Sequence, residues 1–255
     1  MARDRTRRRT NIVITGASSG LGEGIAREFA AKGHNLALCA RRTDRLDQLA
    51  GQLRERHPGI TVLTRKLDVT DQQAVFEVFG AFRAELGSLD RVIANAGLGK
   101  GQPIGTGYVD ANRETVETNV IGLLAQCEAA VEIFNEQRTG HLVVVSSVAA
   151  VRGMRGNVTA YAASKAAAAS LAEGIRAQHH GGPIAVTTLY PGYIESEMTG
   201  RARKTPLMAD AEKGAKALVA AIERERPKAY VPWWPWTPLA QVLRFAPLGW
   251  VRKFS

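Results

Sequence analysis

The sequence contains few cysteines and no long apolar run. Its 255 residues include only Cys39 and Cys127, which cannot form a disulfide framework and do not have the spacing of metal ligands. No apolar stretch reaches the roughly 20 residues that a transmembrane helix needs, and no apolar segment of signal-peptide type follows the basic N-terminus. We therefore expect a cytoplasmic protein with two buried, reduced thiols and no bound metal.

Acidic residues are missing from the C-terminal end of the chain. Residues 226–255 carry five basic and no acidic side chains, and residues 1–10 carry five arginines and one aspartate. Of the net charge of +10, the two ends thus hold +5 and +4, which leaves +1 for residues 11–225. A nucleic-acid-binding protein would more typically carry a basic stripe on its folded body, so we expect no nucleic-acid partner.

The apolar segments predict one large α/β domain. Hydrophobic residues make up 45% of the chain, and apolar runs alternate with helical patterns, which indicates a parallel sheet with helices on both faces. We predict a single doubly wound Rossmann-type sheet of about seven strands in residues 11–231, a basic, disordered arm at 1–10 and a Trp- and Pro-rich tail at 232–255. The predicted strands cover 11–15, 35–40, 61–67, 89–94, 141–145, 184–189 and 229–231.

A glycine-rich turn follows the first predicted strand. It lies between the run 11–15 and an amphipathic helix, and glycines let a backbone turn sharply and approach a pyrophosphate closely. The N-terminus of the following helix offers N–H groups to the phosphates. Because strand, turn and helix are all present, the segment predicts a dinucleotide site. Its residues are Gly16, Ser18, Ser19, Gly20, Leu21 and Gly22.

The tip of the second predicted strand carries Arg41 and Arg42, with no acidic residue before Asp44. An acidic side chain here would bind the ribose 2′-hydroxyl of NAD, whereas arginine suits the 2′-phosphate of NADP. We therefore expect NADP(H); the alternative is that the two arginines only begin a solvated helix over 43–56. After the third strand, Asp68 is expected either to bind the adenine amino group or to cap the next helix.

Residues able to carry chemistry follow six of the predicted strands. Ligands bind at the carboxyl ends of strands in open parallel sheets, so these residues would meet at one edge. They are Gly16, Arg41, Asp68 with Val69, Asn95 with Ala96 and Gly97, Ser147, and Pro191 with Gly192.

Tyr161 and Lys165 lie four residues apart in an Ala-rich run, 160–172, that has no Pro or Gly and favours a helix. Residues with this spacing share one helical face. A neighbouring ammonium stabilises the phenolate and lowers the pKa of tyrosine from its usual value of about 10. The pair therefore predicts a tyrosine that exchanges a proton with a substrate oxygen near neutral pH.

Together these motifs resemble the short, single-domain branch of the short-chain dehydrogenase/reductase family. The resemblance extends over residues 11–200 and implies a seven-stranded Rossmann-type sheet, an NAD(P)-dependent interconversion of alcohol and carbonyl, and a homodimer or homotetramer. It rests on Thr15-Gly16-x-x-x-Gly20-x-Gly22, Asn95-Ala96-Gly97, Asn119, Ser147, Tyr161-x-x-x-Lys165 and Pro191-Gly192.

The resemblance also implies roles for catalytic residues. Tyr161 would be the acid in reduction and the base in oxidation, and Lys165 would lower the pKa of Tyr161 and bind the nicotinamide ribose. Ser147 would polarise the substrate carbonyl. Asn119 would bend its predicted helix, 114–137, and help to hold a water molecule that relays protons to Lys165.

Further positions are implied for the cofactor. Ile194 and Ser196 would meet the carboxamide, and Arg41, supported by Arg42, would favour NADP. Ser147 lies fourteen residues before Tyr161, where relatives more often have thirteen, so Ser146 is the alternative. Ser196 keeps the hydroxyl of the threonine that is frequent in the family.

The tail differs in composition from the rest of the chain. It contains all four tryptophans, Trp233, Trp234, Trp236 and Trp250, next to basic residues, which is typical of a segment in a membrane interface. Thr237 is expected to cap a short helix with Pro238 at its first position. The predicted apolar face of this helix is Leu239, Val242, Leu243 and Ala246.

Two functions follow from these observations. The first is an NADP-dependent oxidoreductase that acts on an alcohol, ketone or aldehyde of lipophilic character, with peripheral membrane contact through the tail. The alternative is a non-catalytic nucleotide-binding scaffold at a membrane or partner surface. For the tail itself, packing on the protein's own core, over the substrate pocket or against a second subunit also remains open.

Overall fold

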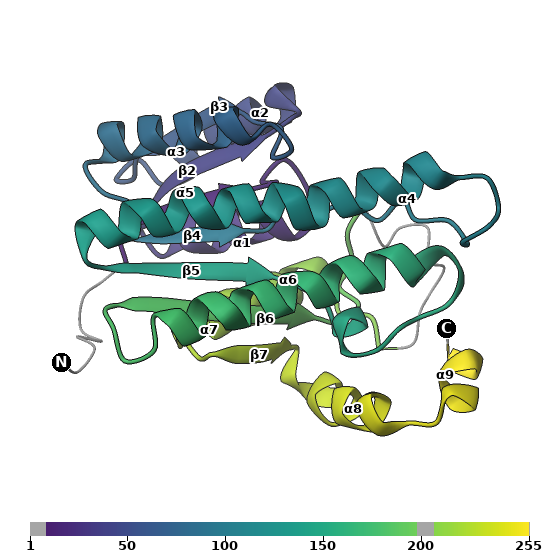
Figure 1. Cartoon of the computed structure of the whole chain (residues 1–255). Helices are drawn as coiled ribbons and strands as arrows, with labels where there is room; N and C mark the ends of the chain where they lie inside the picture. Colours follow the sequence, from purple (N-terminus) through teal and green to yellow (C-terminus); the bar gives the residue numbers. More distant parts are fainter. Residues whose placement is uncertain (1–8, 198–206, 255) are drawn as a thin grey trace.

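The computed structural model describes residues 9–197 and 207–254. Seven strands form one parallel sheet in the order β3-β2-β1-β4-β5-β6-β7, with helices on both faces (Figure 1). This confirms the predicted fold class. The strands are β1 Asn11–Thr15, β2 Asn35–Ala40, β3 Val62–Lys66, β4 Arg91–Ala94, β5 Gly140–Val145, β6 Ile184–Pro191 and β7 Lys228–Val231.

Helices connect the strands and continue into the tail. They are α1 Gly20–Ala31, α2 Thr43–Arg56, α3 Gln72–Leu86, α4 Val109–Val116, α5 Gly122–Gln137, α6 Thr159–Gln178, α7 Ala211–Glu223, α8 Trp233–Phe245 and α9 Leu248–Phe254. Short 3₁₀ turns at Val148–Val151 and Gly156–Val158 lie between β5 and α6.

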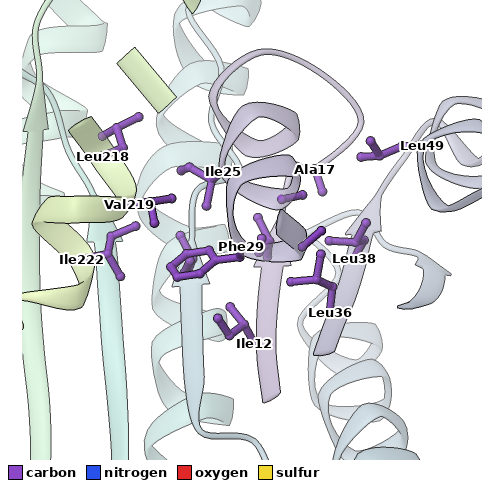
Figure 2. Packing of buried hydrophobic residues seen from close by; sticks show 14 of the residues in the cluster. Ile12, Ala17, Ile25, Phe29, Leu36, Leu38, Leu49, Leu218, Val219 and Ile222 are labelled. Carbon is purple, nitrogen blue, oxygen red and sulfur yellow. The ribbon is translucent and has the colours of Figure 1, made fainter. Parts of the chain in front are cut away.

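Alternate residues of the strands build two cores. Ile12 and Ile14 pack with Phe29 and other apolar side chains of α1, α2 and α7 on one face of the sheet (Figure 2). Val13, which lies between them in sequence, packs on the opposite face with side chains of α3, α5 and α6. The central strands are buried on both faces, as expected for a doubly wound parallel sheet. Cys39 is also buried there, as predicted.

The helix predicted over 114–137 is not one regular helix. It begins earlier, at Val109, and a π-helical segment, Glu117–Ile121, separates α4 from α5. Asn119 lies in this segment, and π-helical turns inside helices are frequent at functional sites. Asn119 interrupts the regular α-helix, as its expected role suggested, and its side chain is buried.

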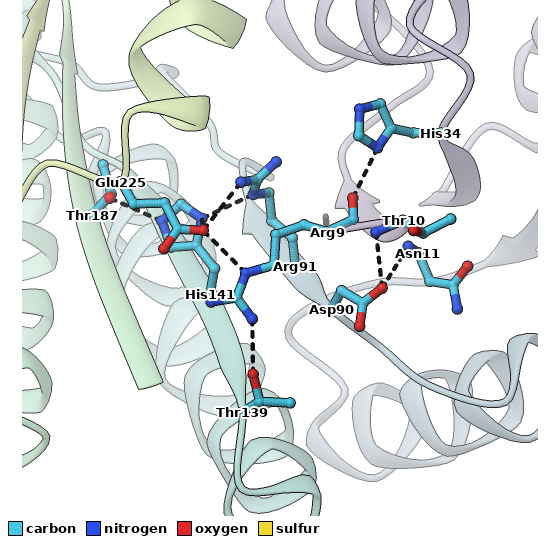
Figure 3. A network of polar contacts seen from close by, with 10 residues as sticks. All are labelled: Arg9, Thr10, Asn11, His34, Asp90, Arg91, Thr139, His141, Thr187 and Glu225. Carbon is cyan, nitrogen blue, oxygen red and sulfur yellow. Dashed lines mark hydrogen bonds and ion pairs between the residues drawn. The ribbon is translucent and has the colours of Figure 1, made fainter. Parts of the chain in front are cut away.

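A buried polar network closes the amino-terminal edge of the sheet (Figure 3). Arg91 on β4 donates from Nε to Nδ1 of His141 on β5 at 2.8 Å. Since Nδ1 is thereby an acceptor, the hydrogen of the neutral ring lies on Nε2, which is 2.9 Å from Thr187 Oγ1. Glu225 supplies the compensating charge, 3.4 Å from Arg91 Nη2. Desolvation by burial is the main reason that the pKa of Arg91 falls to about 10.

The network also fixes the start of the described chain. Arg9 donates from Nε to Glu225 Oε1 at 3.0 Å, and the N–H groups of Thr10 and Asn11 donate to Asp90 Oδ2 at 2.9 and 3.0 Å. Two residues that we assigned to the N-terminal arm thus contact the folded domain. The remaining part of that arm, residues 1–8, lies outside the described residues.

The tail folds back onto the domain, and the predicted start of its helix is wrong. Helix α8 begins at Trp233, with a non-helical backbone at Trp234, so Thr237 is not the N-cap and Pro238 lies inside the helix. The buried residues of α8 are Trp236 and Ala240. Of the predicted apolar face, Ala246 is buried and Val242 is 57% exposed. The ring of Trp236 packs edge-to-face on that of Tyr193, with the ring centroids 5.5 Å apart.

The other tryptophans of the tail remain on the surface. Trp233, Trp234 and Trp250 are exposed, as are Phe245 and Leu248. Within the described residues, no helix combines the length and apolarity needed to cross a membrane.

Candidate active site

A cavity of about 440 Å³ opens at the carboxyl edge of the sheet. It collects almost all the residues that the sequence predicted for a dinucleotide: Gly16, Ser18, Ser19, Gly20, Leu21, Arg41, Arg42, Asp68, Val69, Asn95, Ala96, Gly97, Tyr161, Lys165, Pro191, Gly192, Ile194 and Ser196. Ser147 lines it as well. Two predicted site residues, Gly22 and Asn119, do not line the cavity.

Glycines at the turn after β1 are required by geometry. Gly16 and Gly20 have φ of +63° and +58°, a region that favours glycine. A side chain at Gly16 would lie 2.9 Å from Ala96 Cα, and one at Gly22 would lie 2.4 Å from the carbonyl oxygen of Gly16. Gly22 therefore lets α1 pack against the turn rather than lining the cavity.

Asn95 braces this turn from β4. Its Nδ2 donates to the carbonyl oxygen of Thr15 at 2.9 Å, and the N–H groups of Asn95 and Ala96 both donate to Thr15 Oγ1 at 3.0 Å. Thr15 in turn contacts Gln126 Oε1 at 2.7 Å. Gln126 is fully buried, and sequence reasoning missed it; a lone amide on an apolar helix was the available signal.

Tyr161 and Ser147 form the polar centre of the cavity. Burial is the largest cause of a raised pKa at Tyr161, the hydrogen bond with Ser147 opposes it, and Tyr193 adds to the rise. The spacing of Tyr161 and Lys165 predicted a lowered pKa, so the direction here is the opposite. The alternative serine, Ser146, also lines the cavity, but its hydroxyl donates to the carbonyl oxygen of Lys165 at 2.8 Å.

Lys165 is buried beside Tyr161 on α6. Its Nζ lies 5.8 Å from the centre of the Tyr161 ring and donates to the carbonyl oxygen of Val145 at 2.9 Å. Desolvation lowers the pKa of Lys165 to about 8. A methyl group built on Gly97 would lie 3.2 Å from both Lys165 Nζ and Asn119 Oδ1, so these two side chains flank the same glycine.

The side chain of Asn119 connects three elements. Its Nδ2 donates to the carbonyl oxygen of Leu98 and to Ser164 Oγ, each at 2.9 Å, and its Oδ1 accepts from the N–H of Leu98 at 2.7 Å. Asn119 thus holds the loop after β4 against α6. Ser164 was not singled out from the sequence, although it lies next to Lys165.

Arginines gather where the second strand ends. Arg41 lies 3.8 Å from Asp68, and Arg42 donates to Ser19 Oγ at 2.6 Å and to Ser18 Oγ at 3.3 Å. Asp68 does not cap α3, because it bonds Thr70 and the cap comes from Asp71 instead.

Two further residues complete this arginine cluster and were missed from the sequence. Arg45, on the first turn of α2, and Glu197, after β6, form an ion pair, and Glu197 also pairs with Arg42 at 3.0 Å. No local pattern predicts a contact between positions 152 residues apart.

The residues of this cavity fit a dinucleotide. The glycine turn leaves open backbone beside the N-terminus of α1, where a pyrophosphate would be held. Arginine side chains mark one end of the cavity, and the Tyr161 phenol and Lys165 ammonium mark the other. A doubly wound parallel sheet with this site defines a dinucleotide-binding oxidoreductase.

Comparison with known proteins agrees with this class. The sequence profile of the family described as short chain dehydrogenase matches residues 10–207. An uncharacterised oxidoreductase of Mycobacterium tuberculosis strain H37Rv is 53% identical over 247 residues, which are 97% of this chain and 98% of that protein. The NADP-dependent 3-hydroxy acid dehydrogenase of Salmonella typhimurium is 32% identical over 184 residues, 72% of each protein.

A solved structure is similar as well. The alcohol dehydrogenase from the archaeon Thermococcus sibiricus, complexed with 5-hydroxy-NADP, superposes with a TM-score of 0.77 at 27% identity over 87% of this chain and 95% of that one. The chain belongs to the short-chain dehydrogenase/reductase family, whose members bind a nicotinamide cofactor, and it is an oxidoreductase of that family.

Proposed function

We propose that this protein transfers a hydride between NADP(H) and an alcohol or carbonyl substrate. The observation that carries the proposal is a single cavity lined by Ser147, Tyr161 and Lys165 and also by Arg41 and Arg42 at the tip of β2. When bound, the nicotinamide cofactor supplies or accepts the hydride.

The side chains of this chain would manage the proton and the substrate oxygen. In reduction, the Tyr161 hydroxyl donates its proton to the carbonyl oxygen, and in oxidation its phenolate accepts the alcohol proton. Ser147 donates a hydrogen bond to the same oxygen as negative charge develops there. Lys165 binds the nicotinamide ribose, and its ammonium stabilises the phenolate when the proton has left. Asn119 positions the loop after β4, and a water molecule beside Gly97 would link it to Lys165.

Arginine chemistry supports NADP(H) over NAD(H). Arg41 and Arg42 stand at the tip of β2, where a 2′-phosphate would lie, and Asp68, the acidic side chain beside them, is paired with Arg41. The similarity to an NADP-dependent dehydrogenase of Salmonella typhimurium supports the same choice.

Oxidation of NADPH and of NADH should be measured in parallel over a panel of ketones and aldehydes that includes long-chain compounds. We expect turnover with NADPH and at least tenfold less with NADH. Tyr161→Phe should reduce turnover by about 10²- to 10⁴-fold while leaving NADPH binding unchanged. Full activity of that variant would end the catalytic assignment, and nucleotide binding without turnover by the wild type on every compound would favour the non-catalytic scaffold.

We also propose that the tail contacts the surface of an anionic phospholipid bilayer and that the substrate is lipophilic. Exposed rings of Trp233, Trp234 and Phe245 project from α8, and Trp250 from α9, which gives an apolar surface on the tail. Residues 226–255 around it carry five basic and no acidic side chains. Aromatic rings beside basic residues suit the interface of such a membrane.

Flotation with vesicles that contain anionic phospholipid tests this contact. Because Trp236 packs into the domain, the tail should be kept and Trp234→Ser with Phe245→Ser introduced instead; Ile104→Ser, an exposed apolar residue elsewhere, is the control. We expect the wild type and the control to float and the double variant to remain in solution. Equal flotation of all three proteins, or none by any, removes the membrane proposal and leaves the oxidoreductase proposal intact.

A further inference from the structure

Glu197 bridges two arginines at the end of the cavity where we place the 2′-phosphate. Its Oε2 lies 3.0 Å from Arg42 Nη1, and its Oε1 pairs with Arg45 Nη1. Glu197 and Arg42 both line the cavity. One carboxylate therefore uses its two oxygens to pair with two guanidinium groups, which is the pairing that a phosphate group would make there.

The arginines are positioned before any ligand arrives. Arg42 is held from the side of the glycine turn by the hydroxyls of Ser18 and Ser19. Arg45 lies on the first turn of α2 and keeps roughly half of its side chain exposed, as does Glu197. The pairing is thus reachable by solvent and by a competing anion.

We propose that Glu197 is an internal competitor of the 2′-phosphate and sets how strongly this protein prefers NADP(H) to NAD(H), with Arg45 as an additional 2′-phosphate ligand. The inference rests on the proposed function, because it assumes that the arginine cluster receives the 2′-phosphate. A 2′-phosphate must displace the carboxylate of Glu197 from Arg42 and Arg45, whereas the uncharged 2′-hydroxyl of NAD(H) leaves the ion pairs in place.

The charge of Glu197 is constant under working conditions. Hydrogen bonds from Arg45 and Arg42 are the largest causes that lower the pKa of its carboxyl to about 2. The competition therefore does not fade at the pH values at which the protein would be assayed. Added salt, in contrast, should weaken it, because exposed charges are screened.

Binding of 2′,5′-ADP and 5′-AMP, measured by calorimetry on the full chain, tests the inference without any turnover. These probes differ only in the 2′-phosphate. Exposed ion pairs contribute little individually, so for Glu197→Gln we expect 2′,5′-ADP to bind about 3- to 10-fold more tightly, with 5′-AMP unchanged within about 2-fold. Glu195→Gln is the matched control, because it removes the same charge from an exposed position two residues away, and we expect it to leave both affinities unchanged.

Arg42→Gln separates the two proposals. If it weakens 2′,5′-ADP while Glu197→Gln strengthens it, both proposals stand. If Arg42→Gln weakens 2′,5′-ADP and Glu197→Gln has no effect, the competition is wrong and the NADP proposal survives. If Arg42→Gln and Arg41→Gln both leave 2′,5′-ADP unchanged, the NADP proposal itself fails. Weaker binding of 5′-AMP to Glu197→Gln would show instead that the carboxylate serves the ribose hydroxyl, which overturns the inference.

Arg45→Gln tests whether Arg45 is an additional ligand of the 2′-phosphate. We expect it to weaken 2′,5′-ADP several-fold and to reduce the gain caused by Glu197→Gln when the two substitutions are combined. Unchanged 2′,5′-ADP binding by Arg45→Gln would remove Arg45 from the phosphate site, and additive effects of the two substitutions would show that Arg45 and Glu197 act independently.

Discussion

The indole of Trp236 occupies the space that a side chain at Gly192 would need. A methyl group on Gly192 would lie 2.1 Å from Trp236 Cε2 and 2.2 Å from its Nε1. Gly192 lines the cavity, and Trp236 belongs to α8 in the tail. The tail is therefore packed, through Trp236, against the loop that follows β6. Of the contacts that the sequence left open for the tail, the structure thus shows packing on the protein's own domain.

Gly192→Ala should disturb this contact. Because the added methyl forces the indole or the loop to move, we expect the free energy of unfolding to fall by about 1–3 kcal/mol and nucleotide affinity to fall with it. Gly153→Ala is the control, since a methyl there meets no atom within 4 Å. Chemical denaturation and calorimetric nucleotide binding measure both effects. Wild-type stability and affinity in Gly192→Ala would contradict the close packing.

Ser147→Ala should move the pH dependence of alcohol oxidation. The hydrogen bond from Ser147 opposes the effect of burial on the pKa of Tyr161, so its removal raises that pKa further. We expect the acid limb of kcat/KM to shift to higher pH and the rate to fall by about 10²- to 10³-fold. The measurement is a pH series of alcohol oxidation.

Ser146→Ala is the matched control for this series. Its hydroxyl bonds the carbonyl oxygen of Lys165 and not Tyr161, so we expect a loss of stability of about 1 kcal/mol and an acid limb at the wild-type pH. The assignment of Ser147 would be reversed if Ser146→Ala shifted the limb and Ser147→Ala did not.

Burial of Lys165 should make stability depend on pH. Its pKa is about 8 in the folded protein and near its ordinary value of 10.5 in the unfolded chain. Between these values the unfolded chain binds more protons, so stability rises with pH over this window; below pH 8 the burial penalty of the ammonium is fully present. Relative to Lys165→Met, the wild type should gain about 2 kcal/mol between pH 7.5 and pH 10. Denaturant titrations of both proteins at several pH values measure this gain, and parallel pH profiles would argue against a buried ammonium.

Glu225→Gln should destabilise the protein without changing its chemistry. The substitution removes the carboxylate that compensates Arg9 and Arg91, and we expect a loss of about 2 kcal/mol with kcat unchanged. Glu223→Gln is the control, because its ion pair with Lys32 is more exposed and should contribute less than about 1 kcal/mol. Thermal unfolding of the three proteins decides the matter; equal melting temperatures would show that the network adds nothing to stability.

Much of the fold and site could be predicted because the signals are local. The Tyr161 and Lys165 spacing lies inside α6, and each residue placed after a predicted strand reaches the cavity because all strands are parallel. The glycine turn was predictable for the same reason. Gly16 and Gly20 adopt positive φ, and glycine at both positions is visible in the sequence.

The features that were missed depend on distant residues. Asn119, in the π-helical segment, is held by hydrogen bonds with Leu98 and Ser164, which come from other parts of the chain. The lowered pKa expected for Tyr161 came from spacing alone, whereas burial by the surrounding fold dominates. Likewise the burial of Trp236 was missed, because the ring on which it packs, Tyr193, lies after β6 and outside the tail.

The charged cluster of Arg9, Arg91 and Glu225 (Figure 3) lies where β4 begins. Tyr161 lies at the opposite, carboxyl edge of the sheet, in the cavity lined by the residues that follow the strands. Heat tolerance and substrate range can therefore be selected in separate rounds. A library restricted to the first edge would be screened by survival after heating, and one restricted to the second by product formed. Variants selected in the two screens should combine in one gene with little mutual interference, because the two sites lie at opposite edges of the sheet.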